Sequence, residues 1–129
     1  MSTLKKRADF LKVASQKNSF RKKSIIVSVG ICPAHDAVDL KIGLVVTKKV
    51  GNAVVRNTVK RRLREAIRII LRDDLVMSKF LLIMPTNLVL VANKLTAECL
   101  FGDIVADISE GILFLSKKVI KKPLKIQKV

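Results

Sequence analysis

The residues best suited to do chemistry in this chain are cations. Seven Lys and Arg residues, and no acidic residue, lie between Lys48 and Arg64. Guanidinium groups make paired hydrogen bonds to phosphate, and lysine ammonium groups act beside them as point charges. At 100° per residue, six polar side chains of the stretch 56–68 fall within an arc of about 140° on a helix, whereas Arg62 and Glu65 lie outside it and outside the apolar arc; the six are Arg56, Asn57, Lys60, Arg61, Arg64 and Arg68. This pattern predicts the binding of a phosphate-rich partner.

The opposite side of the same helix is apolar, which gives it a packing face: Val55, Val59, Leu63, Ala66, Ile67 and Ile70. A charged helix that only faces water mixes Glu with Lys four residues apart, and the cationic face here does not. Gly51 permits a positive φ or a close backbone approach, and Asn52 is a suitable N-cap. With Lys48 and Lys49 beside it, the first turn becomes an anion site. We therefore expect a helix over 52–71 that packs through one face and binds anions through the other.

The remaining reactive residues do not suggest protein-based catalysis or a metal site. Four of the ten acids follow the outer face of a second expected helix, as a solvated surface would: Glu98, Asp103, Asp107 and Glu110. His35 is the single histidine, and Cys32 and Cys99 form no CxxC pair. We predict no catalytic residue and no metal ligand in the protein, reduced thiols, and a solvent-exposed His35.

The overall charge narrows the class of partner. The chain has 129 residues, a formal net charge of +16 and a pI near 10.4. Its cations form three blocks, over 1–23, 48–64 and 117–128, which suits an extended polyanion better than a membrane. There is no Trp to anchor a membrane-surface helix, and Pro85 interrupts the longest apolar tract. We expect a cytoplasmic protein with no membrane partner and no small-molecule substrate.

The elements needed to position these residues follow from periodicity. We expect one α+β domain over 1–129, with a single-layer sheet of about four strands packed with helices in the order α-β-β-α-β-α. The expected helices are 3–17, 52–71 and 96–117, with Gly102 and Gly111 weakening the last. The expected strands are 24–31 and 40–47, joined by a turn at 33–36 as a hairpin or meander, and 79–84, which ends at Pro85. Residues 117–129 are expected to form a flexible basic tail.

The stretch from Gly43 to Glu65 resembles the signature of the protein subunit of bacterial ribonuclease P. Its core reads Arg-Asn-x-x-Lys-Arg-x-x-Arg from Arg56 to Arg64, preceded by Lys-Lys-x-Gly-x-Ala-Val. Leu4-Lys5-Lys6 and Asp9-Phe10-x-x-Val13 resemble the N-terminal helix of that family. The resemblance covers residues 4 to about 84.

The resemblance implies a fold and a division of labour. The fold would be that of ribonuclease P proteins, similar to domain 2 of ribosomal protein S5, with a left-handed βαβ crossover that the usual rule does not predict. The protein would be one subunit of an endoribonuclease that removes the 5′ leader of precursor tRNA. The partner RNA would carry out the cleavage and hold most of the Mg²⁺. By this resemblance and the anion-site argument, the expected RNA contacts are Lys48, Lys49, Asn52, Arg56, Asn57, Lys60, Arg61, Arg64 and Arg68.

The leader of precursor tRNA would lie in a groove beside the N-terminal helix. Phe10 and Val13 resemble the wall of that groove, and we add Lys12 and Lys41 as expected contacts. Phe10 is equally well explained as a core anchor. Ala14 replaces an aromatic residue common in the family, Lys17 a glycine, Lys41 an arginine, and Met84 an arginine. These departures predict weaker base stacking, with more of it falling on Phe10 or supplied by Phe20.

Two other functions fit the same cationic helix. The first is an RNA-binding protein of the ribosome or of its assembly, with no role in processing. The second is a helix-turn-helix DNA binder, which is disfavoured because no second helix lies a short turn before Arg56.

Overall fold

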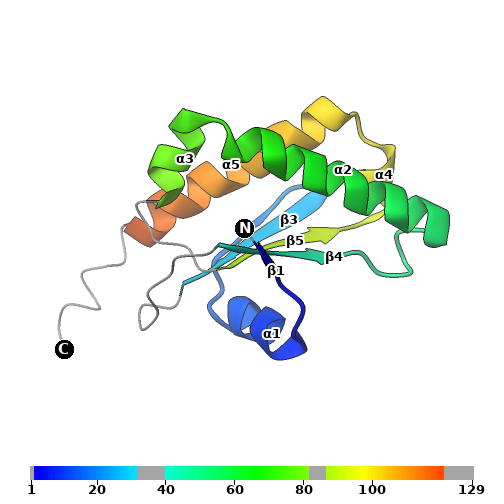
Figure 1. Ribbon diagram of the computed structural model, residues 1–129, viewed down its shortest axis with the longest axis horizontal. Coiled ribbons are helices and arrows are strands. Elements are labelled where there is room, and N and C mark those ends of the chain that lie inside the picture. The colour runs from blue at the N-terminus through cyan, green and yellow to red at the C-terminus, as the bar shows by residue number, and fades with distance from the viewer. Residues whose placement is uncertain (1, 32–39, 82–86, 121–129) are drawn as a thin grey trace.

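The computed structural model describes residues 2–31, 40–81 and 87–120. Five strands form one sheet in the order β1-β4-β5-β3-β2 (Figure 1). The strands are β1 (Ser2–Thr3), β2 (Ser19–Arg21), β3 (Ile25–Gly30), β4 (Lys41–Val45) and β5 (Asn87–Ala92). The helices are α1 (Arg7–Ser15), α2 (Ala53–Leu71), α3 (Asp74–Leu81), α4 (Lys94–Glu98) and α5 (Phe101–Ile120).

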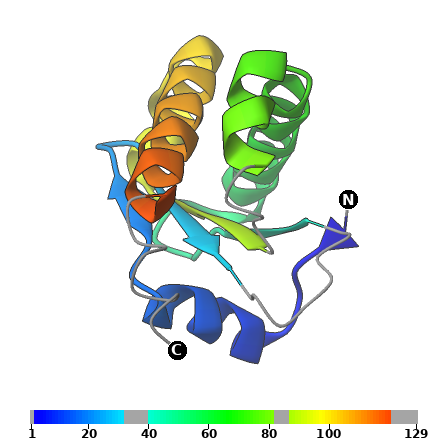
Figure 2. The same cartoon turned by 90° about the vertical axis from the view of Figure 1, so that its left-hand side faces the viewer.

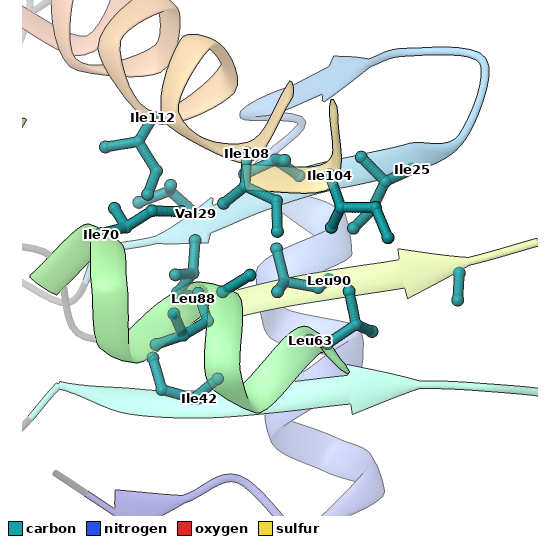
Figure 3. Close-up of a cluster of buried hydrophobic side chains, with 14 of the residues drawn as sticks. Ile25, Val29, Ile42, Leu63, Ile70, Leu88, Leu90, Ile104, Ile108 and Ile112 are labelled. Carbon is teal, nitrogen blue, oxygen red and sulfur yellow. The ribbon is translucent and has the colours of Figure 1, made fainter. Parts of the chain in front are cut away.

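The sheet is covered unequally on its two faces. Helices α2, α3 and α5 lie over one face, while α1 alone lies against the other (Figure 2). Alternate residues of β3 point toward the three-helix side, where Ile25, Val27 and Val29 are fully buried. Figure 3 shows Ile104 and Ile108 of α5 meeting these strands in the main core. The α1 face is therefore the more open side of the sheet.

The chain passes from β4 through α2 to β5 in a left-handed crossover. β4 and β5 are parallel neighbours, paired from Lys41 with Asn87 to Val45 with Val91. In Figure 3 both strands run to the right, β5 lies above β4, and α2 lies in front of them. That arrangement is left-handed, against the usual preference for right-handed crossovers. The expectations of an α+β fold and of this crossover are confirmed.

Two expectations about strands were wrong. The expected strand at 79–84 begins inside α3, and the actual strand is β5. Val76 and Phe80 of α3 are both buried and lie four residues apart, which is helical spacing within a short apolar run. The expected pairing of 24–31 with 40–47 is also wrong, because β5 lies between β3 and β4. The hairpin partner of β3 is instead β2.

The helix boundaries also differ from expectation. The first helix is shorter than 3–17, and β1 precedes it. The expected helix 96–117 is two helices, because Asn93 starts α4 with a capping box and Cys99 leaves helical geometry. α5 continues to Ile120, so residues 117–120 are helical rather than part of a tail. The turn at 33–36 with His35, Cys32, Met84 and residues 121–129 lie outside the described residues.

Candidate nucleic-acid interface

Helix α2 is fixed to the sheet through its apolar face and is capped at its start. Leu63, Ile67 and Ile70 are at most 2% exposed. The Asn52 side chain accepts a hydrogen bond of 3.0 Å from the backbone N–H of Val55, as its position as N-cap requires. This packing holds the polar side of α2 rigidly outward. Whether Asn52 also contacts RNA stays a prediction.

The cationic side of α2 consists of two rows rather than one face. Lys60, Arg64 and Arg68 border a cleft of about 320 Å³ between α2 and the β1–β4 edge of the sheet. Leu4, Ile42, Leu44 and Ile67 contribute its apolar lining, and Thr3 a hydroxyl group. Arg68 also pairs with Glu65, with 2.5 Å between Nη1 and Oε1. The cleft therefore combines cations at its rim with an apolar floor.

The second row, here called the outward row, faces away from the fold. Asn57 and Arg61 share a shallow depression of about 330 Å³ with Val54 and Thr58, and all four residues are exposed. Arg56, at the start of the first row, is only partly exposed. Its Nε is buried and finds no acceptor among the described residues. The expected RNA contacts on α2 thus differ in access, and Arg61 is among those presented outward.

Arg62 has a structural role that periodicity did not reveal. Its Nη1 donates to the carbonyl oxygens of Thr96 at 3.2 Å and Ala97 at 3.1 Å, and its Nη2 donates to that of Cys99. These carbonyls belong to the end of α4, where no further helical N–H groups are available. Arg62 therefore fastens α4 to α2. Its position outside both the apolar and the cationic arcs was the only signal in the sequence.

The lysines before α2 lie at the carboxyl ends of β4 and β5. Lys48 and Lys49 are exposed in a turn closed by a 3.0 Å hydrogen bond from Val50 N–H to the Thr47 carbonyl. Lys49 and Lys94 line a shallow depression of about 370 Å³ there. Lys94 was missed because its closeness to Lys49 depends on the parallel pairing of β4 with β5. This end of the sheet extends the cationic surface of α2.

On the other face of the sheet, Phe10 and Val13 of α1 serve first as packing residues. A Cβ on Gly43 would lie 2.5 Å from Cε1 of Phe10, and one on Gly30 would lie 2.7 Å from Cγ2 of Val13. The two glycines therefore let α1 lie close to the sheet. Val13 is 1% exposed, so it seats α1, whereas Phe10 is only partly buried.

The two lysines expected near the leader are both exposed, Lys12 on α1 and Lys41 on β4. Lys41 and Val45 flank Gly43 on the α1 face of β4. Because Phe10 lies over Gly43, its ring stands between them. The structure therefore places Lys41 and Val45 on opposite sides of Phe10.

An open row of side chains lies on the α1 face next to Phe10. Strand pairing aligns Val45 with Val91, Val91 with Ile26, and Ile26 with Arg21. The three apolar members are partly exposed, and Arg21 at the end of the row is exposed. Four paired strands make this row, here called the sheet strip, about 14 Å wide. No single segment of sequence contains it, so strand order was needed to find it.

The end of α1 is fastened by a side-chain amide. Gln16 donates from Nε2 to the Ile31 carbonyl and accepts at Oε1 from the Ile31 N–H, both at 2.8 Å. Lys17 then takes a positive φ of 56°, a conformation that favours glycine. This is the position where the resemblance led us to expect glycine. Lys17 therefore carries backbone strain that a glycine would not.

Two acidic residues of α5, Asp107 and Glu110, are engaged by residues of the turn between β2 and β3. Asp107 Oδ2 accepts a 2.9 Å hydrogen bond from the Ser24 hydroxyl, and Glu110 lies 2.9 Å from Lys22 Nζ. Hydrogen bonding to Glu110 raises the pKa of Lys22.

Within the described ranges, no three His, Cys, Asp or Glu residues gather as metal ligands would. Across the same ranges, no helix combines the length and apolarity that a membrane span needs.

Comparison with known proteins agrees with this geometry. The sequence model of the ribonuclease P family matches residues 1–113. A ribonuclease P protein component of Gluconacetobacter diazotrophicus is 40% identical over 108 residues, covering 81% of this chain and 83% of the relative. Another, of Bacillus velezensis, is 32% identical over 100 residues, covering 78% and 77%. The ribonuclease P protein of Staphylococcus aureus shares the fold with a TM-score of 0.67 at 24% identity, covering 91% of this chain and 96% of that one. The chain therefore belongs to the ribonuclease P family of protein components.

Proposed function

We propose that this chain anchors the RNA of ribonuclease P through α2 and holds the single-stranded 5′ leader of precursor tRNA on the α1 face of its sheet. The RNA subunit then performs the cleavage that matures the 5′ end, and the Mg²⁺ ions for that step are held mainly by the RNA. The complex works in the cytoplasm. The protein contributes binding energy and position rather than a reacting group.

The observation that carries the first part is the outward row of α2. Among the described residues, the only ion pair on this helix joins Glu65 to Arg68. Arg61 and Arg64, three residues apart, and Lys60 and Arg64, four residues apart, therefore repel one another unless an anion lies between them. Phosphates supply such anions, and the Asn57 amide can donate to a phosphate or accept from a ribose 2′-hydroxyl.

The leader assignment is supported by the chemistry of the sheet strip. An unpaired base is bound by an aromatic ring or apolar surface beside cations, which hold its phosphates. Phe10 provides a partly exposed ring, and Val45, Val91 and Ile26 provide an apolar floor next to it. Double-stranded RNA is too wide and too strongly hydrated to use such a narrow apolar strip, so a single strand is the better fit.

The first experiment reconstitutes the full chain with a ribonuclease P RNA at limiting Mg²⁺. Adding the protein should raise the rate of leader cleavage from precursor tRNA. Arg61→Glu should reduce this gain, while Lys79→Glu, an equal charge reversal at an exposed site on α3, should retain it. An unchanged rate on adding the wild-type protein would refute the proposed function.

The second experiment tests the leader surface. Phe10→Ala in the reconstituted enzyme should lower the affinity for precursor tRNA more than that for mature tRNA. Leu11→Ala removes a 58% exposed apolar side chain from the same helix and should leave both affinities unchanged. If Phe10→Ala lowers thermal stability but leaves the ratio of affinities intact, the ring is only a core anchor.

A further inference from the structure

The outer edge of the sheet carries an aromatic surface that the proposed function does not use. Phe20 of β2 and Phe114 of α5 have ring centroids 4.9 Å apart, with their planes tilted by 41°. Phe114 is 49% exposed, more than any other phenylalanine in the described part of the chain. Gly111 permits this pairing, because a Cβ there would lie 3.0 Å from Cδ2 of Phe20. The backbone thus brings α5 close enough to present two rings together.

Cations lie on both sides of the ring pair. Lys22 Nζ is 5.8 Å from the centroid of the Phe20 ring, within the range of a cation–π contact. Lys118 follows Phe114 by one helical turn, and its Nζ lies 3.4 Å from the carbonyl oxygen of Lys17. An aromatic platform flanked by cations is the arrangement that binds single-stranded nucleic acid. The centre of a protein–protein interface, by contrast, is depleted of lysine.

This platform is continuous with the sheet strip. Arg21 ends the strip and is the chain neighbour of Phe20, which points to the opposite face of β2. Figure 2 shows β2 at the edge of the sheet, with α1 below it and α5 above it. A single strand that crosses the strip toward Arg21 therefore reaches this edge, and Phe114 lies on the α5 side of it.

We propose that the Phe20–Phe114 pair receives a base of the single-stranded leader beyond the sheet strip, with Lys118 contacting a flanking phosphate and Lys22, which also pairs with Glu110, bordering the Phe20 ring. This inference rests on the proposed leader surface and extends it around the edge of the sheet. It assigns the pair to the part of the leader farther from the cleavage site.

The test uses the enzyme reconstituted from the full chain and ribonuclease P RNA, with precursor tRNAs that carry 2-aminopurine at successive leader positions. Stacking quenches this fluorescent base, so a distal position should be quenched by the wild-type enzyme. Phe114→Ala and Phe114→Leu should both remove that quenching, and Phe114→Trp should restore it. Phe114→Ala should also weaken binding of a long-leader precursor by about fivefold or more. A precursor whose leader ends within the strip should bind as before.

Leu75→Ala is the matched control, since Leu75 is a 66% exposed apolar residue on α3 away from this edge, and it should change nothing. The inference is overturned if no leader position depends on Phe114, or if Phe114→Leu keeps the quenching. It is also overturned if long and short leaders lose affinity equally. Quenching at near positions that depends on Phe10 tests the strip separately. If neither the Phe10-dependent nor the Phe114-dependent quenching is seen, the proposed leader surface is refuted. If the Phe10-dependent quenching is seen and the Phe114-dependent quenching is not, only this extension is refuted.

Discussion

Neighbouring arginines on α2 should separate RNA binding from stability. Arg61 is exposed, whereas the guanidinium group of Arg62 donates to three carbonyl oxygens at the end of α4. Replacing each by alanine removes one positive charge from the same helix. We expect Arg61→Ala to weaken RNA binding at unchanged stability, and Arg62→Ala to reduce stability first.

The magnitudes follow from these contacts. A hydrogen bond from a charged donor contributes about 1.5–3 kcal/mol, and three bonds that share one guanidinium group are not additive. We therefore expect Arg62→Ala to cost about 2–4 kcal/mol, or roughly 10 °C in Tm for a chain of this size. Arg61→Ala should stay within about 0.5 kcal/mol of the wild-type stability, as most surface substitutions do. It should raise the Kd for ribonuclease P RNA by about five- to tenfold.

Thermal unfolding followed by circular dichroism and RNA titration at several salt concentrations would measure both effects. The slope of log K against log salt concentration should become shallower by about one unit for Arg61→Ala. Arg62→Lys, which keeps the charge but cannot bridge three carbonyls, should still lose most of the stability. The reasoning is refuted if Arg62→Ala leaves Tm unchanged and weakens RNA binding as much as Arg61→Ala does.

Four further substitutions test how the fold positions these surfaces. Lys17→Gly should stabilise the protein by about 1 kcal/mol in urea unfolding, because it relieves the positive φ, and a loss of stability would contradict this. Gly102→Ala should stabilise α5 by up to about 1 kcal/mol, since a Cβ at this position would meet no atom within 4 Å apart from the adjacent backbone of its own helix. Gly111→Ala should destabilise the protein despite the same gain in helix propensity, and equal effects of the two substitutions would be the contrary result. Gly43→Ala should displace the ring of Phe10, cost about 1–3 kcal/mol, and lower the preference for precursor over mature tRNA.

The sequence predicted α2 well because its apolar period runs without interruption and Asn52 marks its start. It also predicted β3, because Ile25, Val27 and Val29 recur at every second position, as the residues on one face of a strand do. The apolar run after Asp73 was ambiguous: it is too short for period alone to separate a helix from a strand. Val76 and Phe80 become diagnostic only when both are known to be buried.

The parts of the interface that were missed depend on contacts between distant segments. Arg62 meets carbonyl groups 34–37 residues away, and any residue type at those positions offers a carbonyl. The sheet strip joins residues of four strands, so it follows from strand order rather than from any local pattern. Lys94 is found near Lys49 only once β5 is placed beside β4.

The central claim is that α2 faces ribonuclease P RNA, and site-specific cross-linking tests it most directly. A photo-cross-linking amino acid would replace Thr58, exposed in the outward row of α2, or Ala106, exposed on α5. In the complex reconstituted from each full-length variant, position 58 should cross-link to the RNA and position 106 should not. Cross-links from 106 with none from 58 would contradict the account.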